Sequence, residues 1–386
     1  MNPPRRSGPA VWATVDRRGN GALSKSCSTR AGAVRHTVHH QLVDARGTPA
    51  HDPDGVHGID ELLRPEPLPV ERLLFDSPIV RVGAFRCPGS HPLFADSGPI
   101  VNPVFVFPRT PVWIQHEGGA PFLSDPTVAT LYNRGQTYRR RSVAGHADHC
   151  DWFALAPEII AEIAEARRAR PPETPERPFA RACTPVDSRT YLVQRQLVTA
   201  LATGRPDALF VEENVISLAA RIVESEAGCA GTARPRAAVS ARTLRQHRDH
   251  AEQAREILAV EFACSGTVAG LAARVGVSAF HLCRVFHRHT GLTLHAYRTE
   301  LRLRHALERL PETDAGVTPV ALDAGFSSHS HFTAAFRRTF GLTPSAFRLA
   351  SRRRAPAWAR PSAGPAGSPR PAPPRERPPP AESAAT

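Results

Sequence analysis

The stretch "DAGFSSHSHFTAAFRRTFGLTPSAFR", residues 323–348, decides the fold of the C-terminal part of the chain. After a turn-like "GFSS" it places three phenylalanines at intervals of four: Phe332, Phe336 and Phe340. Apolar residues four apart share one face of an α-helix, so we predict that these rings pack into a core. Arg337 and Arg338 then lie off that face, and "GLTP" ends the unit. We expect a short helix with an apolar inner side and a basic outer side, preceded by a helix from Thr318 and Pro319 and a turn at Gly325 and Phe326.

The same plan occurs earlier, in residues 267–290. Thr267 is a good N-cap for a helix, and Gly276 permits the tight turn that follows. Ser278 can cap the next helix. That helix is expected to bury three apolar residues: Leu282, Val285 and Phe286. Two short helices joined by a glycine turn, with arginine on the outer face of the second, predict a helix-turn-helix in each place.

A long amphipathic helix over about 294–310 joins the two predicted units. Its expected core residues are Tyr297, Leu301, Leu303, Ala306 and Leu310. Seventeen residues at 1.5 Å each give a length of about 25 Å. Such a helix can hold two helix-turn-helices on one side of DNA, about one helical turn apart.

Residues from about 250 to 350 resemble the DNA-binding domain of the AraC/XylS family of bacterial transcription regulators. The resemblance rests on "LAARVGVSAFHLCRVFHRHTGLTLHAYRTELRLRHAL" and, more specifically, on "ALDAGFSSHSHFTAAFRRTFGLTPSAFR". It implies a unit that binds double-stranded promoter DNA and enters two successive major grooves. It also implies that RNA polymerase is a possible partner.

Carried over from the family, the base contacts of the first recognition helix fall on Phe280, Cys283 and Arg284. We expect most from Arg284, because arginine reads guanine with two hydrogen bonds. Cys283 departs from the longer polar side chain that members often carry there. Phe280 has an alternative interpretation as a partly buried hydrophobic residue.

The corresponding positions of the second recognition helix are Ser328, His329, His331 and Ala334. Many relatives carry arginine in place of Ala334, so we expect this helix to read fewer bases. Arg288, Arg337 and Arg338 suit phosphates, which position the protein without specifying sequence; the alternative for Arg337 and Arg338 is an ordinary solvated charge. A metal site at His329 and His331 is disfavoured, because residues two apart point in different directions on a helix.

Charge and cysteine usage agree with a nucleic-acid partner. The formal net charge is +13, and residues 236–354 hold 18 arginines against nine acidic residues. Such a balance favours an anionic partner. There is no apolar run of membrane-spanning length and no signal-peptide pattern, so DNA is expected rather than a membrane. Seven scattered cysteines without a C-x-x-C pair predict a reducing, cytoplasmic location.

The N-terminal part has a different texture. Short β-type runs divided by Pro and Gly fill residues 72–156 and predict antiparallel strands in a small barrel or sandwich. This part resembles, more weakly, the cupin-like barrel that many AraC-type regulators place before their DNA-binding domain. That resemblance implies a sensor for a small-molecule effector.

Three helices are expected after the strands. The first follows Pro157, the second has Asp187 as N-cap and Gly204 as stop, and the third has Asp207 and Gly228 in the same roles. The apolar stripe of the third helix is expected to comprise Leu209, Val215, Ile216, Ala219 and Ile222. This stripe either packs on the barrel or forms the surface of a homodimer.

We find no catalytic motif and expect no cofactor and no metal. A metal cupin needs H-x-H and a following glutamate, whereas His91 stands alone and His116 with Glu117 lacks a partner. The loop "GHADHCDW" offers His146, His149 and Cys150, but a polar turn is the simpler interpretation. "YRRRS", residues 138–142, either binds an anionic effector or is an exposed run of charge.

The sequence thus predicts an α+β protein: a disordered extension (1–70), a β-barrel sensor (71–170), a helical dimerisation segment (171–230), a linker (231–245), the DNA-binding domain (246–352) and a disordered Pro/Ala/Arg-rich tail (353–386). The expected function is sequence-specific transcription regulation, not enzymatic activity. Two alternatives stay open: a cupin-type metalloenzyme with an accessory helical domain, and a DNA-binding regulator without a ligand.

Overall fold

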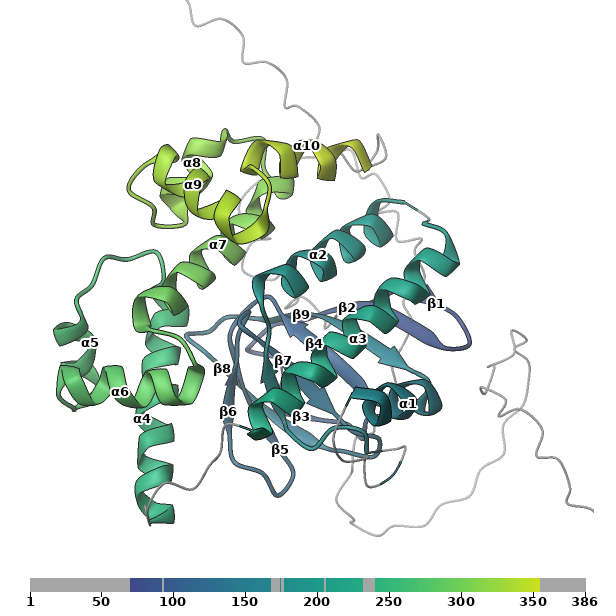
Figure 1. The fold of residues 1–386 in the computed structure, drawn as a ribbon, viewed down its shortest axis with the longest axis horizontal. Helices are drawn as coiled ribbons and strands as arrows, with labels where there is room; N and C mark the ends of the chain where they lie inside the picture. The colour runs from purple at the N-terminus through teal and green to yellow at the C-terminus, as the bar shows by residue number, and fades with distance from the viewer. Residues whose placement is uncertain are drawn as a thin grey trace, which may run out of the picture.

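The structure, a computed structural model, describes residues 70–91, 94–167, 174, 177–204, 206–231 and 240–354. The expected disordered extension and almost all of the expected tail lie outside this part of the chain. Two β-sheets with three helices come first, and seven helices follow them (Figure 1). Figure 1 shows the first helix-turn-helix, α5 and α6, at the left and the second, α8 and α9, at the top, with α7 running between them.

The strands form one six-stranded and one four-stranded sheet. The larger sheet has the order β1-β2-β9-β4-β7-β10 and the smaller the order β3-β8-β5-β6. The strands are β1 (Val70–Asp76), β2 (Val80–Cys87), β3 (Asp96–Ser97), β4 (Val104–Pro108), β5 (Val112–His116), β6 (Phe122–Ser124), β7 (Val128–Tyr132), β8 (Tyr138–Ser142), β9 (Asp148–Leu155) and β10 (Cys183–Pro185).

The helices fall into two groups. Those that follow the sheets are α1 (Pro157–Arg167), α2 (Ser188–Thr203) and α3 (Ala208–Gly231). The C-terminal ones are α4 (Ala241–Val260), α5 (Val268–Val275), α6 (Ala279–Thr290), α7 (Leu294–Glu312), α8 (Val317–Asp323), α9 (His329–Phe340) and α10 (Pro344–Arg354).

The α+β class and the antiparallel strands are confirmed, since every strand pairing found is antiparallel. A closed cupin barrel is not confirmed, because the strands of the described residues divide into two sheets. The larger sheet also extends past residue 170, where we expected only helices. There β10 pairs with β7, placing Cys183 opposite Thr130.

The predicted helix ends are partly right. Asp187 caps α2, accepting hydrogen bonds from the backbone N–H groups of Arg189 and Thr190, and the helix stops before Gly204. By contrast, α3 does not stop at Gly228 but continues to Gly231. Gly228 does not adopt the left-handed conformation that ends a helix. Leu209 is 71% exposed instead of part of the inner stripe, whereas Val211 in the same first turn of α3 is fully buried.

Two expected boundaries also move. α4 begins at Ala241, inside the expected linker 231–245, because the Ser240 hydroxyl caps it by accepting from Thr243 N–H; residues 232–239 are not described. α10 runs to Arg354 and so enters the expected tail. In the second unit, α8 starts at Val317 rather than at Thr318, after Gly316.

The local design of the first helix-turn-helix is as predicted. The hydroxyl of Thr267 accepts from Gly270 N–H at the start of α5, and that of Ser278 accepts from His281 N–H at the start of α6. Gly276 between them has a φ of +78°, which a residue with a Cβ rarely adopts. The inner face of α6 is buried as expected: Leu282, Val285 and Phe286.

The joining helix α7, which we call the strut, and the second unit also have the buried residues predicted for them. Every residue expected to be buried in α7 is buried: Tyr297, Leu301, Leu303, Ala306 and Leu310. The phenylalanines of α9 are buried as well, with the rings of Phe332 and Phe336 5.5 Å apart and those of Phe336 and Phe340 4.7 Å apart. The helix α7 has 19 residues, which corresponds to about 28 Å.

The two helix-turn-helix units belong to different hydrophobic cores. The core of the second unit is continuous with that of the larger sheet, α2 and α3. α2 contacts both α9 and α10, so the segment expected to dimerise lies against the second unit. The first unit has its own core, which includes Leu123 of β6 and Val143 after β8. Each unit is therefore packed on a different part of the N-terminal region.

The turn of the second unit touches the loop between α4 and α5, and we predict a measurable consequence. Gly325 has a φ of +83°, and a Cβ there would lie 2.4 Å from the carbonyl oxygen of Ala263, in the loop after α4. Gly276 has nearly the same φ, but a Cβ there would meet nothing within 4 Å.

Gly276→Ala is therefore expected to cost only the strain of a left-handed residue, about 1–2 kcal/mol. Gly325→Ala adds a backbone clash and should lower the free energy of unfolding by clearly more. Urea denaturation of both variants measures the difference. Equal losses of stability in the two variants would contradict the close approach of Gly325 to Ala263.

Candidate nucleic-acid interface

The outer face of α6 carries the residues expected to contact bases. Phe280 is 79% exposed, and Cys283 and Arg284 are exposed beside it. This placement fits the contact interpretation of Phe280 better than the alternative of a partly buried residue. Within the described residues, Arg284 and Arg288 make no hydrogen bond or ion pair through their side chains, so both guanidinium groups are free to reach DNA.

The outer face of α9 is less well supplied with donors. Ser328 is the N-cap of α9, and its hydroxyl accepts a hydrogen bond from His331 N–H. This hydroxyl is therefore already engaged in a bond within the helix. His329 lies 3.3 Å from the Thr318 hydroxyl through Nδ1, and Ala334 is exposed but has no polar atom in its side chain. His331 stacks edge-on to Phe326 with ring centroids 5.5 Å apart.

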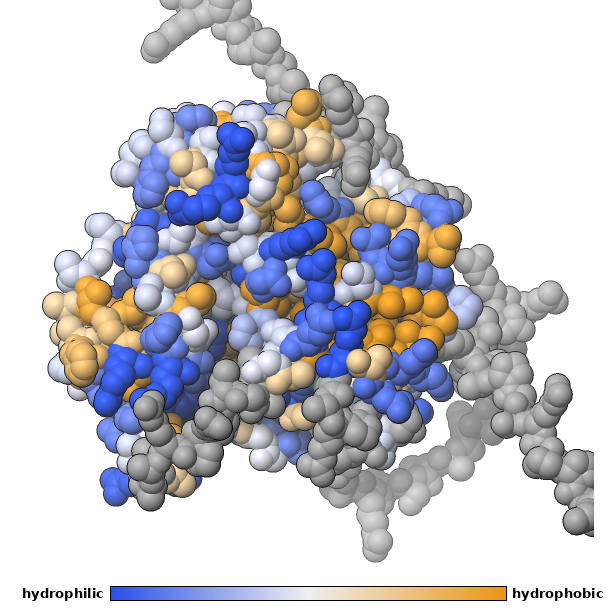
Figure 2. All heavy atoms as spheres, in the orientation of Figure 1, coloured by the Kyte–Doolittle hydropathy of each residue, from blue (hydrophilic) through white to orange (hydrophobic). Residues whose placement is uncertain are grey.

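Arg337 and Arg338 lie in the last turn of α9 and are exposed. Within the described residues neither side chain makes a hydrogen bond or ion pair, which fits phosphate contact and equally an ordinary solvated charge. Figure 2 shows strongly hydrophilic side chains gathered over α4 and α6 at the lower left.

A domain family described as "Helix-turn-helix domain" matches residues 271–350. This range begins within α5 and contains the rest of the first unit, α7 and the second unit. The C-terminal part of the chain is an AraC-type helix-turn-helix domain. The predicted resemblance is confirmed for this part of the chain.

Curated relatives match about a fifth of the chain. The transcriptional regulator GlxA of Rhizobium meliloti is 43% identical over 82 residues, which are 21% of this chain and 25% of the relative. The probable transcription factor PqrA of Proteus vulgaris is 40% identical over 78 residues, 20% of this chain and 64% of the relative. The chain thus spans less than two thirds of either relative.

Two solved structures also align with this chain, both with low TM-scores. A transcriptional regulator from Chromobacterium violaceum with an AraC-type DNA-binding domain is 29% identical and covers 27% of this chain and 93% of its own, with a TM-score of 0.26. ToxT from Vibrio cholerae covers 71% of this chain and 98% of its own, at 8% identity and a TM-score of 0.31.

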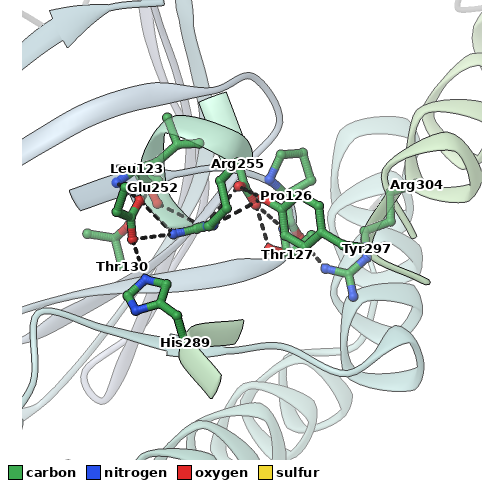
Figure 3. Close-up of polar contacts among 11 residues, drawn as sticks. Leu123, Pro126, Thr127, Thr130, Glu252, Arg255, His289, Tyr297 and Arg304 are labelled. Atoms are coloured by element: carbon green, nitrogen blue, oxygen red, sulfur yellow. Dashed lines mark hydrogen bonds and ion pairs between the residues drawn. The ribbon is translucent and has the colours of Figure 1, made fainter. Parts of the chain in front are cut away.

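A buried polar network joins the AraC-type domain to the smaller sheet (Figure 3). Arg255 of α4 is 4% exposed and donates to Asp125, which is fully buried, at 2.9 Å. It also donates to Glu252 at 2.9 Å, to the Leu123 carbonyl at 3.0 Å and to the Tyr297 hydroxyl at 3.1 Å. The network fixes α4 and α7 to the loop between β6 and β7.

Glu252 extends this network to the recognition helix α6. It accepts from Leu123 N–H of β6 at 3.0 Å and lies 2.6 Å from Nε2 of His289 in α6. Burial opposes ionisation of Glu252, but Arg255 and His289 outweigh it and lower the pKa to about 2. The carboxylate is therefore charged at neutral pH.

A second network ties α7 to the larger sheet and α2. Arg195 of α2 donates to Asp151 of β9 and to Glu308 of α7, both at 2.6 Å. Glu308 also accepts from the Tyr191 hydroxyl at 2.9 Å and pairs with Arg109, which follows β4. A small cavity of about 180 Å³ lies here, lined by Arg109, His149 and Glu308 among others.

A larger cleft of about 480 Å³ lies between the smaller sheet and α4. One wall holds Trp113 and the exposed arginines of "YRRRS", Arg139 and Arg141; the other holds Glu252 and Glu256 of α4. Arg141 lies 5.0 Å from the Trp113 ring centroid. The middle arginine, Arg140, is buried and pairs with Asp148 at 2.8 Å. Of the three arginines in this run, Arg140 thus forms a buried ion pair, whereas Arg139 and Arg141 are exposed in the cleft.

The histidines considered for a metal are dispersed. His116 is buried among Phe122, Tyr132 and Tyr138, and burial lowers its pKa to about 4. His149 also has a pKa of about 4, from burial and from Arg109, whose guanidinium lies 2.9 Å from Nε2. No three His, Cys, Asp or Glu side chains among the described residues are placed to hold a metal ion.

The length and composition of the helices in the described part of the chain bear on membrane insertion. No single helix there is long and apolar enough to cross a membrane, although the bent pair α5 and α6 passes on length and composition when taken together.

Sequence reasoning missed both buried networks. Asp125, Arg255 and Arg195 carry no pattern that separates a buried charge from a solvated one, and charged residues are seldom fully buried. The only available signal was their position: Arg255 and Arg195 stand on helices among apolar residues at helical spacing.

Proposed function

We propose that this protein is a sequence-specific, double-stranded-DNA-binding transcription regulator that reads promoter DNA with α6 and α9. The observation that carries the proposal is the pair of helix-turn-helices joined by α7. Their outer faces hold exposed arginines that have no ion-pair partner among the described residues: Arg284 and Arg288 on the first unit, and Arg337 and Arg338 on the second. Guanidinium groups on an exposed recognition helix suit guanine edges and phosphates. Such a regulator acts in the bacterial cytoplasm.

Selection of bound DNA from a genomic library with the full-length protein tests the proposal. We expect recovered sites with two conserved boxes about one helical turn apart, 10–10.5 base pairs, to suit α6 and α9. Affinity should fall steeply with salt, because phosphate contacts release counterions. Recovery of unrelated sequences, or binding independent of salt, would contradict the proposal.

We also propose that the N-terminal region controls DNA binding through a small-molecule effector. The support is the cleft of about 480 Å³, which has the smaller sheet on one side and α4 of the AraC-type domain on the other. A ligand in it would contact both parts at once. Thermal-shift screening of small molecules tests this; a hit that raises the melting temperature should lose its effect in Trp113→Ala, with Trp152→Phe in the larger sheet as control.

Of the segment expected to form a homodimer, α3 rather than α2 offers the surface. Nine residues of α2 are buried within the chain, whereas Leu209 and Phe210 at the start of α3 are 71% and 45% exposed. Figure 2 shows hydrophobic side chains over the region of α3 and β1 at the right. Sedimentation of the full chain distinguishes dimer from monomer, and contact with RNA polymerase stays an expectation.

A further inference from the structure

Three histidines gather beside the recognition helix α6, outside the positions expected to contact bases. His247 and His250 lie on α4, one turn apart, and His281 lies in the first turn of α6. The ring centroid of His281 is 5.2 Å from that of His247 and 5.6 Å from that of His250. All three side chains are half-buried. Two helices thus bring three imidazoles to one place on the surface of the first unit.

The ring nitrogens of this cluster are not used within the described chain. Nδ1 of His247 and Nδ1 of His250 are buried and have no hydrogen-bond partner. Nothing in the described residues therefore fixes the protonation of these rings. Because these two Nδ1 atoms are buried, His247 and His250 can donate to an external group only through Nε2.

The charges around the cluster are positive and unbalanced. The positive charges of Arg284 and Arg288 on α6 act on His247 and lower its pKa, and neither arginine is paired within the described residues. The carboxylates of the neighbouring elements are engaged elsewhere: Asp249 with Arg248, Glu252 with Arg255 and His289, Glu256 with Arg141, and Glu261 with Arg274 of α5. An anion would therefore balance the cluster.

We propose that His247, His250 and His281 form a binding site for one backbone phosphate of duplex DNA, and that this phosphate is bound with uptake of a proton. The inference rests on the proposed function, since it adds a contact beside the base-reading face of α6. A protonated imidazole donates a charge-assisted hydrogen bond to a phosphate oxygen, which is stronger than a neutral one.

The direction of the pH dependence follows from the environment of the free cluster. Burial, then the neighbouring imidazoles and arginines, lowers the pKa of His247 and of His281 below the usual value of 6.5. A bound phosphate favours the charged ring and raises the pKa. Between the free and the bound pKa, the complex holds more protons than the free protein, so binding strengthens as the pH falls through that window. Each unit of pKa shift strengthens binding by at most about tenfold.

The test compares the full-length protein with His247→Gln/His250→Gln/His281→Gln on a selected DNA site, at constant salt and at about pH 6 and about pH 8. The wild type should bind about three- to tenfold tighter at the lower pH, and the triple variant should lose most of that gain. Because His146 and His295 are exposed and lie outside both recognition helices, His146→Gln/His295→Gln is the matched control and should keep the gain. Calorimetry in two buffers of different ionisation enthalpy counts the protons directly.

A triple variant that keeps its melting temperature and the whole pH gain would overturn the phosphate site. If the triple variant does not fold, His281→Gln alone should still lower the proton count, and an unchanged count would equally overturn the inference. Absence of binding by the wild type at both pH values is a different result, because it contradicts the proposed function and not the cluster.

Discussion

Replacement of Arg284 by alanine is expected to weaken binding to the cognate DNA site by about 1–3 kcal/mol, roughly five- to 150-fold in Kd. The side chain is exposed on α6 and has no partner among the described residues, so the free protein loses no internal contact. In the complex, two donors to the O6 and N7 atoms of a guanine would be lost. The preference for that guanine should fall together with the affinity.

Fluorescence anisotropy on the cognate site and on a site with that guanine replaced measures both effects. Arg189→Ala is a matched control, since Arg189 is an exposed arginine on α2, distant in sequence from both recognition helices. The control removes the same charge and should leave sequence preference unchanged. If Arg284→Ala binds the cognate site as well as the wild type does, the placement of α6 in the major groove is wrong.

Replacement of Arg255 by alanine is expected to lower the free energy of unfolding by about 3–5 kcal/mol. The large effect comes from the groups left behind: Asp125 is fully buried, and Glu252 is 4% exposed. Without the guanidinium, both carboxylates keep only neutral donors or His289. A buried charge without its partner is costly, whereas the intact pair contributes much less to net stability.

Urea denaturation followed by tryptophan fluorescence measures this loss. Arg274→Ala is the control, because its pair with Glu261 is exposed and should contribute little. Arg255→Met combined with Asp125→Asn removes one buried charge of each sign and should recover part of the loss. A loss for Arg255→Ala no greater than that of the control would contradict the buried network.

The sequence predicted best those parts in which one residue determines the local backbone. Gly276 with its positive φ, and the caps Thr267, Ser278 and Asp187, are read from residue type alone. The buried face of α9 follows from the spacing of its phenylalanines. The exposed positions of Phe280 and Arg284 follow from the same periodicity.

Long-range pairing could not be read in this way. The division into two sheets depends on which strands meet, and strand periodicity does not contain that information. The short β10 segment was missed because three residues are too few for a period. Arg255 and Asp125 are 130 residues apart in sequence, and nothing local indicates that they meet in the core.

The continuous core between the larger sheet, α2 and the second helix-turn-helix limits how freely this protein can exchange domains with others. In a chimaera that joins the AraC-type domain to a foreign N-terminal region, the surfaces of α9 and α10 now covered by α2 would face water. A working exchange must carry α2 with the C-terminal part. An exchange that begins before Asp187 therefore keeps the α2-facing surfaces of α9 and α10 covered, whereas one that begins at the boundary of the sequence match does not.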